Sequence, residues 1–290
     1  MKISKPSITI IGAGAVGSAW LDFFKHGGYP LRSVWRSETG YLADEDYNIH
    51  RELNRPLPVS DEEIGDWIFI TTPDDSIKPA VKLLSETEID WSGKIVIHCS
   101  GNMPASVLNP LGNKGAKTVS MHPIQTFQKG DGKEKLETIY ISLQGNSSAI
   151  DLLKNVVDQL KSKPLILTEN QKKAVHISAV FASNYLVALL NSSDHLLKEN
   201  GIEEGVNILE PLIHQTLHNI LEKGPEKSLT GPISRGDYNT VNEHLNFLAD
   251  KNDDELSLYR LLGKTCLSLT RKQGRLSNAK MDKLEKLFGD

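Results

Sequence analysis

The chain has 290 residues, of which 24% are charged and 39% hydrophobic. This composition is typical of a globular protein with room for two domains, and it excludes a disordered or fibrous chain. The formal net charge of −4 gives no indication of nucleic acid or an anionic membrane as a partner.

The first expected element is an apolar strand at 8–11 that runs into a glycine-rich turn and a helix at 15–26. In this context Gly-x-Gly-x-x-Gly is typical of dinucleotide binding, because the first amides of the helix can hold a pyrophosphate. Gly12 permits the turn, Gly14 lets the backbone approach the phosphates, and Gly17 lets helix and strand pack closely. The alternative is a β–α turn without a ligand. The candidate cofactor-binding residues here are Gly12, Ala13, Gly14, Ala15, Val16 and Gly17.

The end of the second expected strand, 31–35, indicates which dinucleotide binds. An acidic residue at this point would hold the ribose hydroxyls of NAD. The sequence instead reads Trp35-Arg36-Ser37. A guanidinium and a hydroxyl can hold a 2′-phosphate, so we expect NADP. The alternative for Arg36 is a solvated loop residue.

Further strands are expected at 66–71, 94–98, 117–121 and 138–142, with helices after the first and the last of them. Near-continuous apolar strands that alternate with helices predict a parallel sheet covered on both faces, a doubly wound Rossmann-type α/β fold. Ligands bind beyond the carboxyl ends of such strands. The candidate cofactor-binding residues in the loops that follow these strands are Thr71, Thr72, Pro73, Ser100, His122 and Pro123. Ordinary turn chemistry is the alternative for each.

Helical periodicity replaces the strand pattern near residue 168 and continues to the C-terminus. We therefore expect a dinucleotide-binding domain at 1–167 and an all-helical domain for substrate binding and dimerisation at 168–290. Helices are expected at 171–200, 203–222, 237–248, 253–272 and 278–288.

Lys173, His176 and Asn184 are spaced to share one face of the expected helix at 171–200. A polar line on an otherwise apolar helix is a candidate site, because buried polar groups need partners. His176, helped by Lys173, would donate a proton to a carbonyl oxygen as hydride arrives, and Asn184 would orient the reacting group. A core histidine bonded to a backbone carbonyl, with Lys173 in solvent, is the alternative.

A second polar cluster lies in the loop 229–237. Ser234 and Arg235 would hold the carboxylate or phosphate of a small anionic substrate, because nothing nearby in sequence needs a cation. Asp237 is also an N-cap for the next helix.

Four segments together resemble one family: the glycine turn, Met121–Phe127, the segment from His176 to Leu186, and Leu229–Asp237. The chain resembles bacterial proteins that pair a Rossmann-like NADP-binding domain with the DUF2520 domain. These resemble 6-phosphogluconate-dehydrogenase-like reductases, including ketopantoate reductase and pyrroline-5-carboxylate reductase. The resemblance implies an NADP(H)-binding oxidoreductase that is a homodimer. Related β-hydroxyacid dehydrogenases carry a Lys and an Asn one turn apart on the corresponding helix, whereas Lys173 and Asn184 are three turns apart.

The sequence therefore predicts hydride transfer between NADPH and a small carbonyl or imine bound in an interdomain cleft. A non-catalytic NADP-binding redox regulator and a reductase that uses the deazaflavin F420 remain alternatives. We expect a cytoplasmic protein, because only Cys99 and Cys266 occur and no signal peptide precedes the first strand. The apolar stretch at 175–190 is broken by polar residues, so we expect no membrane span and, in addition, no bound metal.

Overall fold

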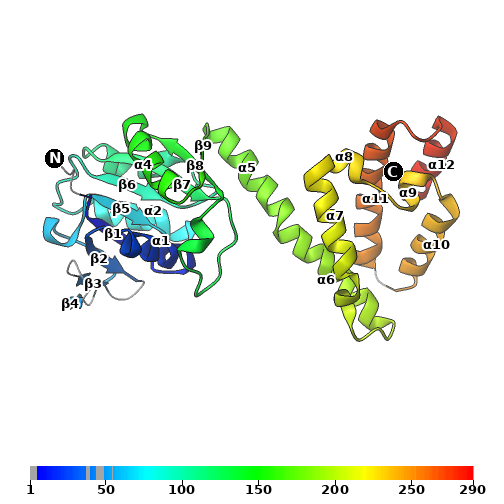
Figure 1. Cartoon of the computed structure of the whole chain (residues 1–290), viewed down its shortest axis with the longest axis horizontal. Helices are drawn as coiled ribbons and strands as arrows, with labels where there is room; N and C mark the ends of the chain where they lie inside the picture. The colour runs from blue at the N-terminus through cyan, green and yellow to red at the C-terminus, as the bar shows by residue number, and fades with distance from the viewer. Residues whose placement is uncertain (1–4, 37–39, 44–48, 54, 252, 290) are drawn as a thin grey trace. The chain divides into compact units, whose positions relative to one another are not determined.

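The computed structural model describes residues 5–36, 40–43, 49–53, 55–251 and 253–289. It divides into two compact units, residues 1–184 and 185–290 (Figure 1). The expected change from sheet to helix falls between strand β9 (Lys163–Ile166) and helix α5 (Glu169–Ala182). Helix α5 therefore belongs to the unit that contains the sheet, and the compact helical unit begins one helix later than the change of class.

Nine strands form one sheet in the order β4-β3-β2-β1-β5-β6-β7-β8-β9. Strands β2, β1, β5, β6 and β7 run parallel to one another. On one side β3 pairs antiparallel with β2 and β4 with β3; on the other side β8 pairs antiparallel with β7, and β9 pairs parallel with β8. The doubly wound sheet is confirmed, with the difference that the expected strand at 138–142 pairs antiparallel to β7. The bounds are β1 Ile8–Ile11, β2 Leu31–Trp35, β3 Gly40–Ala43, β4 Ile49–Leu53, β5 Trp67–Ile70, β6 Ile95–His98, β7 Lys117–Pro123 and β8 Tyr140–Gly145.

Helices cover both faces of the sheet because its strands are apolar on both sides. Helices α1 (Ala15–His26) and α4 (Ser147–Gln159) pack on one face, where Trp20 and Phe24 are fully buried. Helix α2 (Asp74–Ser85) and the short α3 (Asn109–Gly112) pack on the other. Strand β2 lies on one side of β1, and β5 lies on the other side, so the strand order reverses between β1 and β5. The carboxyl ends of β1 and β5 therefore flank a topological switch point, which is where ligands bind in such sheets.

The second unit is built from helices around one core that contains Val241, Leu245, Leu267, Leu284 and Phe288. The expected helix at 171–200 is divided at Ser183, whose φ of −122° and ψ of −71° leave the helical region. The bounds are α6 Asn184–Glu199, α7 Glu210–Lys223, α8 Pro225–Ser228, α9 Pro232–Arg235, α10 Tyr238–Ala249, α11 Asp253–Gln273 and α12 Asn278–Phe288. Short 3-10 helices lie at Asp61–Glu63, Ala105–Leu108, Lys133–Leu136 and Gly205–Leu209.

The segment Glu169–Glu199 is long and apolar enough to cross a membrane by length and composition. A single such segment is weak evidence for a span, since helices of soluble proteins pass the same test. Its first two turns carry Lys172, Lys173 and His176, which are costly to place in a bilayer.

Candidate active site

The glycine turn between β1 and α1 is shaped by close backbone contacts. Gly12 has a φ of +100°, and a Cβ there would lie 2.6 Å from the backbone nitrogen of Thr72. A Cβ on Gly17 would lie 2.1 Å from the carbonyl oxygen of Gly12, whereas a Cβ on Gly14 would meet nothing within 4 Å. Gly12 thus allows the turn to take a positive φ, and Gly17 allows the helix to pack closely against the turn. Gly14 leaves open space into which a ligand can approach the backbone. Helix α1 begins at Gly14 with no side-chain cap and no acidic residue in its first turn, as an anion site requires.

Two adjoining cavities extend from this turn along the carboxyl edge of the sheet. One, of about 530 Å³, is lined by the turn, Arg36 and residues 71–73. The other, of about 420 Å³, reaches residues 99–101, His122, Pro123 and Phe127. Gly14, Thr71, Thr72 and Pro73 line both cavities, which together we call the groove. In the part of the chain that the structure describes, the buried hydroxyl of Thr72 has no hydrogen-bond partner. An uncapped helix and an unpaired hydroxyl beside a long groove fit a dinucleotide.

The residues at the end of β2 have different environments. Arg36 is exposed and lines the first cavity. Trp35, expected to contact the cofactor, is instead fully buried, and its indole nitrogen donates to the hydroxyl of Ser33 at 2.7 Å. It shapes the turn through its carbonyl oxygen, which accepts the amide of Gly12. Ser37 lies outside the described residues.

Lys172 is a buried charged residue that contacts the groove through Ser100, which lines the second cavity. Its side chain lies on the first turn of α5, is 2% exposed, and donates from Nζ to the carbonyl oxygen of Ser100 at 2.6 Å. The hydroxyl of Ser100 donates to Asp74 Oδ2 at 2.8 Å. Burial lowers the pKa of Lys172 to about 8, although the nearby Cys99 and Asp74 favour its charged form. An amine with this pKa is suited to proton transfer near neutral pH.

Two imidazoles accompany Lys172. His122 and His176 pack edge to face, with 6.3 Å between ring centroids. A Cβ on Gly101 would lie 2.6 Å from His176 Nδ1 and 2.9 Å from His122 Nε2, so both rings approach this glycine as closely as its lack of a side chain permits. Within the described part of the chain neither imidazole has a hydrogen-bond partner, which leaves both rings able to bond a ligand.

Burial and the charge of Lys172 decide how His122 and His98 titrate. Burial, together with that charge, lowers the pKa of His122 to about 3. Burial and the same charge lower the pKa of His98 to about 4. His98 Nε2 lies 3.1 Å from the carbonyl oxygen of Pro104, and its Nδ1 accepts from the amide of Ser100. Both rings are therefore neutral at physiological pH, and His98 serves to fix the loop that presents Ser100 and Gly101.

The expected line of Lys173, His176 and Asn184 is not a single site. Lys173 is exposed and pairs with Glu169 at 3.4 Å, and Asn184 is exposed and accepts a hydrogen bond from Ser183. Only His176 joins the buried cluster, because it follows Lys172 by one turn whereas Lys173 is rotated toward solvent. Sequence reasoning missed Lys172. The signal was present: Lys172 and His176 have the one-turn spacing that the related dehydrogenases show for Lys and Asn.

Ser234 and Arg235 lie in the helical unit and have partners there. Ser234 is buried and donates to Gln273 Oε1 at 2.9 Å. Arg235 pairs with Asp237 at 3.0 Å, so the expectation that nothing nearby needs a cation is wrong. The side chain of Arg235 is nevertheless 64% exposed.

The fold and the groove define the class of Rossmann-like dinucleotide-binding proteins, and the family models agree. Residues 1–123 match the Rossmann-like domain, and residues 139–266 match the domain of unknown function DUF2520. The chain therefore contains a Rossmann-like domain followed by a DUF2520 domain, and the resemblance inferred from its motifs is confirmed. No curated protein matches the chain in sequence.

Solved structures with a similar fold include nicotinamide-dependent enzymes. A Bacteroides fragilis protein, named provisionally as an NADP oxidoreductase, shares 20% identity over 90% of this chain and 98% of its own, with a TM-score of 0.69. An imine reductase from Myxococcus stipitatus in complex with NADP+ shares 13% over 96% and 99%, with a TM-score of 0.57. A reductive aminase from Aspergillus terreus with NADPH and ethyl levulinate shares 15% over 98% and 92%, with a TM-score of 0.55. At these identities the likeness establishes the fold.

Proposed function

We propose that the protein is an NADP(H)-dependent oxidoreductase that reduces a small carbonyl or imine compound at the His122 end of the groove. The observation that carries this proposal is that His122, which lines the second cavity, packs against His176, while buried Lys172 bonds to Ser100 of the same cavity lining. The imine reductase and the reductive aminase of similar fold, solved with NADP+ and NADPH, support the same reaction class.

The roles of the residues follow from their charge and placement. A bound nicotinamide would supply the hydride. Once hydride reaches the substrate carbon, the electron pair left on oxygen or nitrogen must take a proton. We assign His176 as the donor of that proton and protonated Lys172 as the cation that stabilises the developing negative charge. Neutral His122 would orient the reacting group, taking the role first expected of Asn184.

Adjacent lysines provide a matched test of the cluster. Lys172→Met is expected to lower kcat/KM for NADPH-dependent reduction by about a hundredfold or more, because it removes the charge beside the imidazoles. Lys173→Met, which removes an exposed lysine one position away, should leave kcat/KM within about twofold. The substrate is first found by following NADPH oxidation across a panel of carbonyl and imine compounds, and the Kd for NADPH is measured for each variant.

Equal kcat/KM in the two lysine variants would overturn the assignment of Lys172. Tight NADPH binding without oxidation across the whole panel would instead favour a regulator that senses the cofactor. Reduction with F420 in place of NADPH would favour the deazaflavin alternative.

NADP is proposed as the cofactor because Arg36 is the charged residue that lines the first cavity. An anionic substrate is proposed on Arg235, whose exposed edge can still take a carboxylate beside its contact with Asp237. The measurement for Arg235 is the KM for the identified substrate. A KM unchanged in Arg235→Ala would remove this role.

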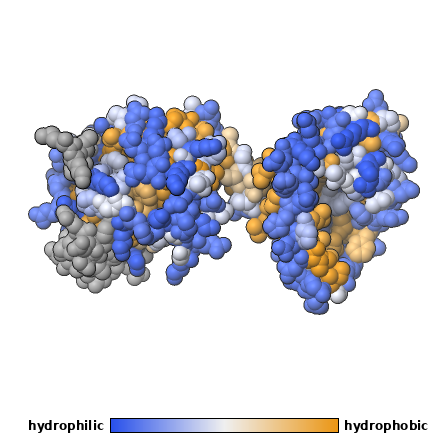
Figure 2. All heavy atoms as spheres, in the orientation of Figure 1, coloured by the Kyte–Doolittle hydropathy of each residue, from blue (hydrophilic) through white to orange (hydrophobic). Residues whose placement is uncertain are grey.

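A homodimer through the helical unit is proposed from its exposed apolar side chains. Val187 on α6 and Leu212 and Leu221 on α7 are 69%, 63% and 84% exposed. Figure 2 shows apolar side chains gathered on the surface of this unit. Exposed apolar patches of this kind are typical of interfaces between proteins.

A further inference from the structure

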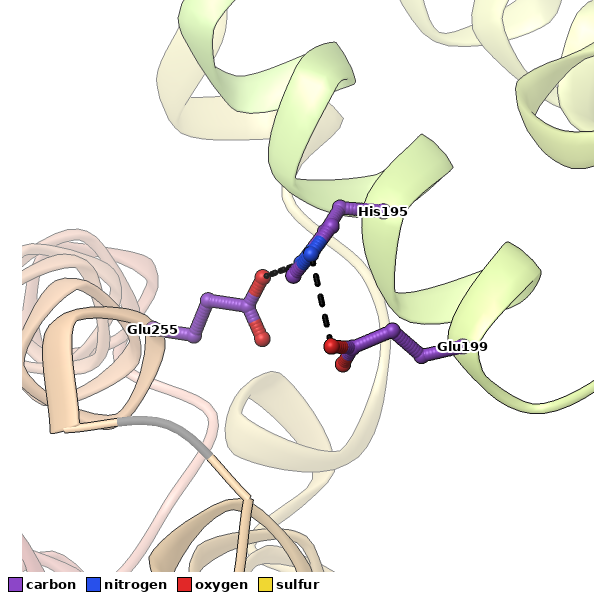
Figure 3. Close-up of side chains that lie close together, drawn as sticks. All are labelled: His195, Glu199 and Glu255. Atoms are coloured by element: carbon purple, nitrogen blue, oxygen red, sulfur yellow. Dashed lines mark hydrogen bonds and ion pairs between the residues drawn. The ribbon is translucent and has the colours of Figure 1, made fainter.

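Three side chains with metal-binding atoms converge in the helical unit, apart from the proposed active site. His195 and Glu199 lie one turn apart on α6, and Glu255 comes from the first turn of α11 (Figure 3). One ligand atom from each residue lies within 4.8 Å of the other two.

The imidazole stands between the two carboxylates. His195 Nδ1 lies 2.9 Å from Glu255 Oε1, and Nε2 lies 3.4 Å from Glu199 Oε1. Both carboxylates point toward the space beside the imidazole ring (Figure 3). The side chain of Glu255 is only 12% exposed, and its second oxygen, Oε2, is buried with no hydrogen-bond partner among the described residues. A buried carboxylate oxygen without a partner is costly and calls for a bound group.

The charges of the cluster do not balance without a further cation. Two carboxylates share one imidazole, which carries at most one positive charge. Lys198, the nearest cation on α6, pairs with Asp194 at 2.9 Å. Within the described ranges no lysine or arginine forms an ion pair with Glu199 or Glu255. Glu255 also lines a small cavity together with Leu196 and Leu258. The other residues of this cavity are mostly apolar, so they offer no positive charge to balance the carboxylate.

We propose that His195, Glu199 and Glu255 bind a divalent transition-metal ion, for which Zn²⁺ is the best match. Zinc takes mixed imidazole and carboxylate ligands at about 2.0–2.2 Å, so neighbouring ligand atoms of a tetrahedral site lie about 3.3 Å apart. The ion binds one nitrogen of the ring, so only one of the separations of 2.9 and 3.4 Å joins two of its ligand atoms; either value is close to the expected one, and the three ligand atoms lie within 4.8 Å of one another. The exposed side of the cluster leaves a position for water. The bound ion would join α6 to α11 and give the orphaned oxygen of Glu255 a partner.

Titration of the full-length, metal-free, untagged chain with ZnCl₂ tests the site. We expect one ion per chain, with Glu255→Gln and His195→Ala each weakening zinc affinity by about tenfold or more. Glu255→Gln keeps the shape of the side chain, so circular dichroism should confirm that it folds. Cobalt(II) should give tetrahedral visible absorption bands in the wild type that both variants lose. His214→Ala is the matched control, because His214 and Glu210 form an exposed pair one turn apart on α7 without a third ligand.

A second readout is thermal unfolding without NADPH. Zinc should raise the Tm of the wild type and of His214→Ala, but not of the two site variants. Absence of zinc binding would overturn the proposal. So would zinc binding that neither site variant weakens, since the ion would then lie elsewhere, for example at His122 and His176.

Discussion

At the scale of single residues, the choice between NADP and NAD depends on a guanidinium at the end of β2. Arg36 is exposed beside the first cavity, and Arg32 is exposed earlier on the same strand without lining it. A charge-assisted contact with a 2′-phosphate contributes on the order of 1.5–3 kcal/mol. Arg36→Ala should therefore weaken NADPH binding about tenfold or more and leave NADH binding unchanged. Fluorescence titration with both cofactors measures this, and Arg32→Ala is the control. An equal loss for both cofactors would show that Arg36 does not select the phosphate.

Neutral buried histidines make stability depend on pH. The folded-state pKa values of His98 and His122 are about 4 and about 3, below the ordinary 6.5. Well above pH 6.5, from about pH 7.5, both rings are neutral in either state and contribute little pH dependence. Between pH 6.5 and 4 the unfolded chain binds protons that the folded chain does not, so the free energy of unfolding falls as pH falls.

The expected slope is up to about 1.4 kcal/mol per pH unit for each ring. Urea unfolding between pH 7 and 4.5 measures it. His122→Asn should remove nearly all of the contribution of one ring from this slope. His218→Asn, which changes an exposed residue of α7, should leave the slope as it is. A slope unchanged in His122→Asn would mean that His122 charges freely in the folded protein.

The burial of Lys172 could not be predicted from the sequence. Spacing places Lys172 and Lys173 on the same helix but does not by itself decide which of them faces the sheet, because the two adjacent lysines share the same polar residues before them and the same apolar residues after them. The partners that decide it, the carbonyl of Ser100 and the ring of His122, come from loops far away in the sequence. The glycine turn was predictable because its steric requirements are local.

At the scale of elements, the start of α5 sets the position of Lys172 and His176. The hydroxyl of Thr168 accepts the amide of Gln171, and the side chain of Gln171 accepts the amide of Thr168, which is a capping box. Thr168→Ala should lower the free energy of unfolding by about 1 kcal/mol and also reduce kcat, since the first turn carries Lys172. Thr168→Ser should restore both. Ser277→Ala is the control, because Ser277 caps α12 without a side-chain hydrogen bond. Equal losses in Thr168→Ala and Ser277→Ala would contradict the capping argument.

Central elements were predictable and edge elements were not. Strands β1, β5 and β6 at the centre of the parallel core are nearly continuous apolar runs, and the sequence locates them to within one or two residues. Strand β9 is a mostly exposed edge strand that contains Pro164, so neither apolar alternation nor composition marks it. The antiparallel direction of β8 depends on the hairpin geometry after β7, which periodicity does not encode. The break at Ser183 is likewise invisible in an apolar segment without proline or glycine.

At the scale of the whole molecule, the two units have separate cores and different roles. The sheet unit with α5 holds the groove, Lys172 and both imidazoles, so the groups proposed for proton transfer all lie within residues 1–184, whereas Arg235 belongs to the helical unit. The helical unit holds the proposed metal site and the exposed apolar helices. We therefore expect the dimer interface to lie on the surface of the helical unit.

Dimer formation is expected because water-exposed leucine and valine side chains gain free energy when they are buried. Full burial of one such side chain contributes about 1.5–3 kcal/mol, and the helical unit exposes several on α6 and α7. Light scattering coupled to gel filtration should give twice the chain mass of 32.1 kDa for the wild type. Leu221→Glu, alone or with Val187→Glu, should shift the protein toward the monomer, because a carboxylate buried without a partner is costly.

Leu83→Glu is the control for this prediction, since Leu83 is 52% exposed on α2 in the sheet unit. It should leave the dimer intact. Dimer loss in Leu83→Glu alone would place the interface on the sheet unit, and a monomeric wild type would remove the dimer altogether. Because Leu221 lies outside residues 1–184, NADPH affinity is expected to stay unchanged in Leu221→Glu. Loss of assembly with retained cofactor binding would therefore assign the two functions to different units of the chain.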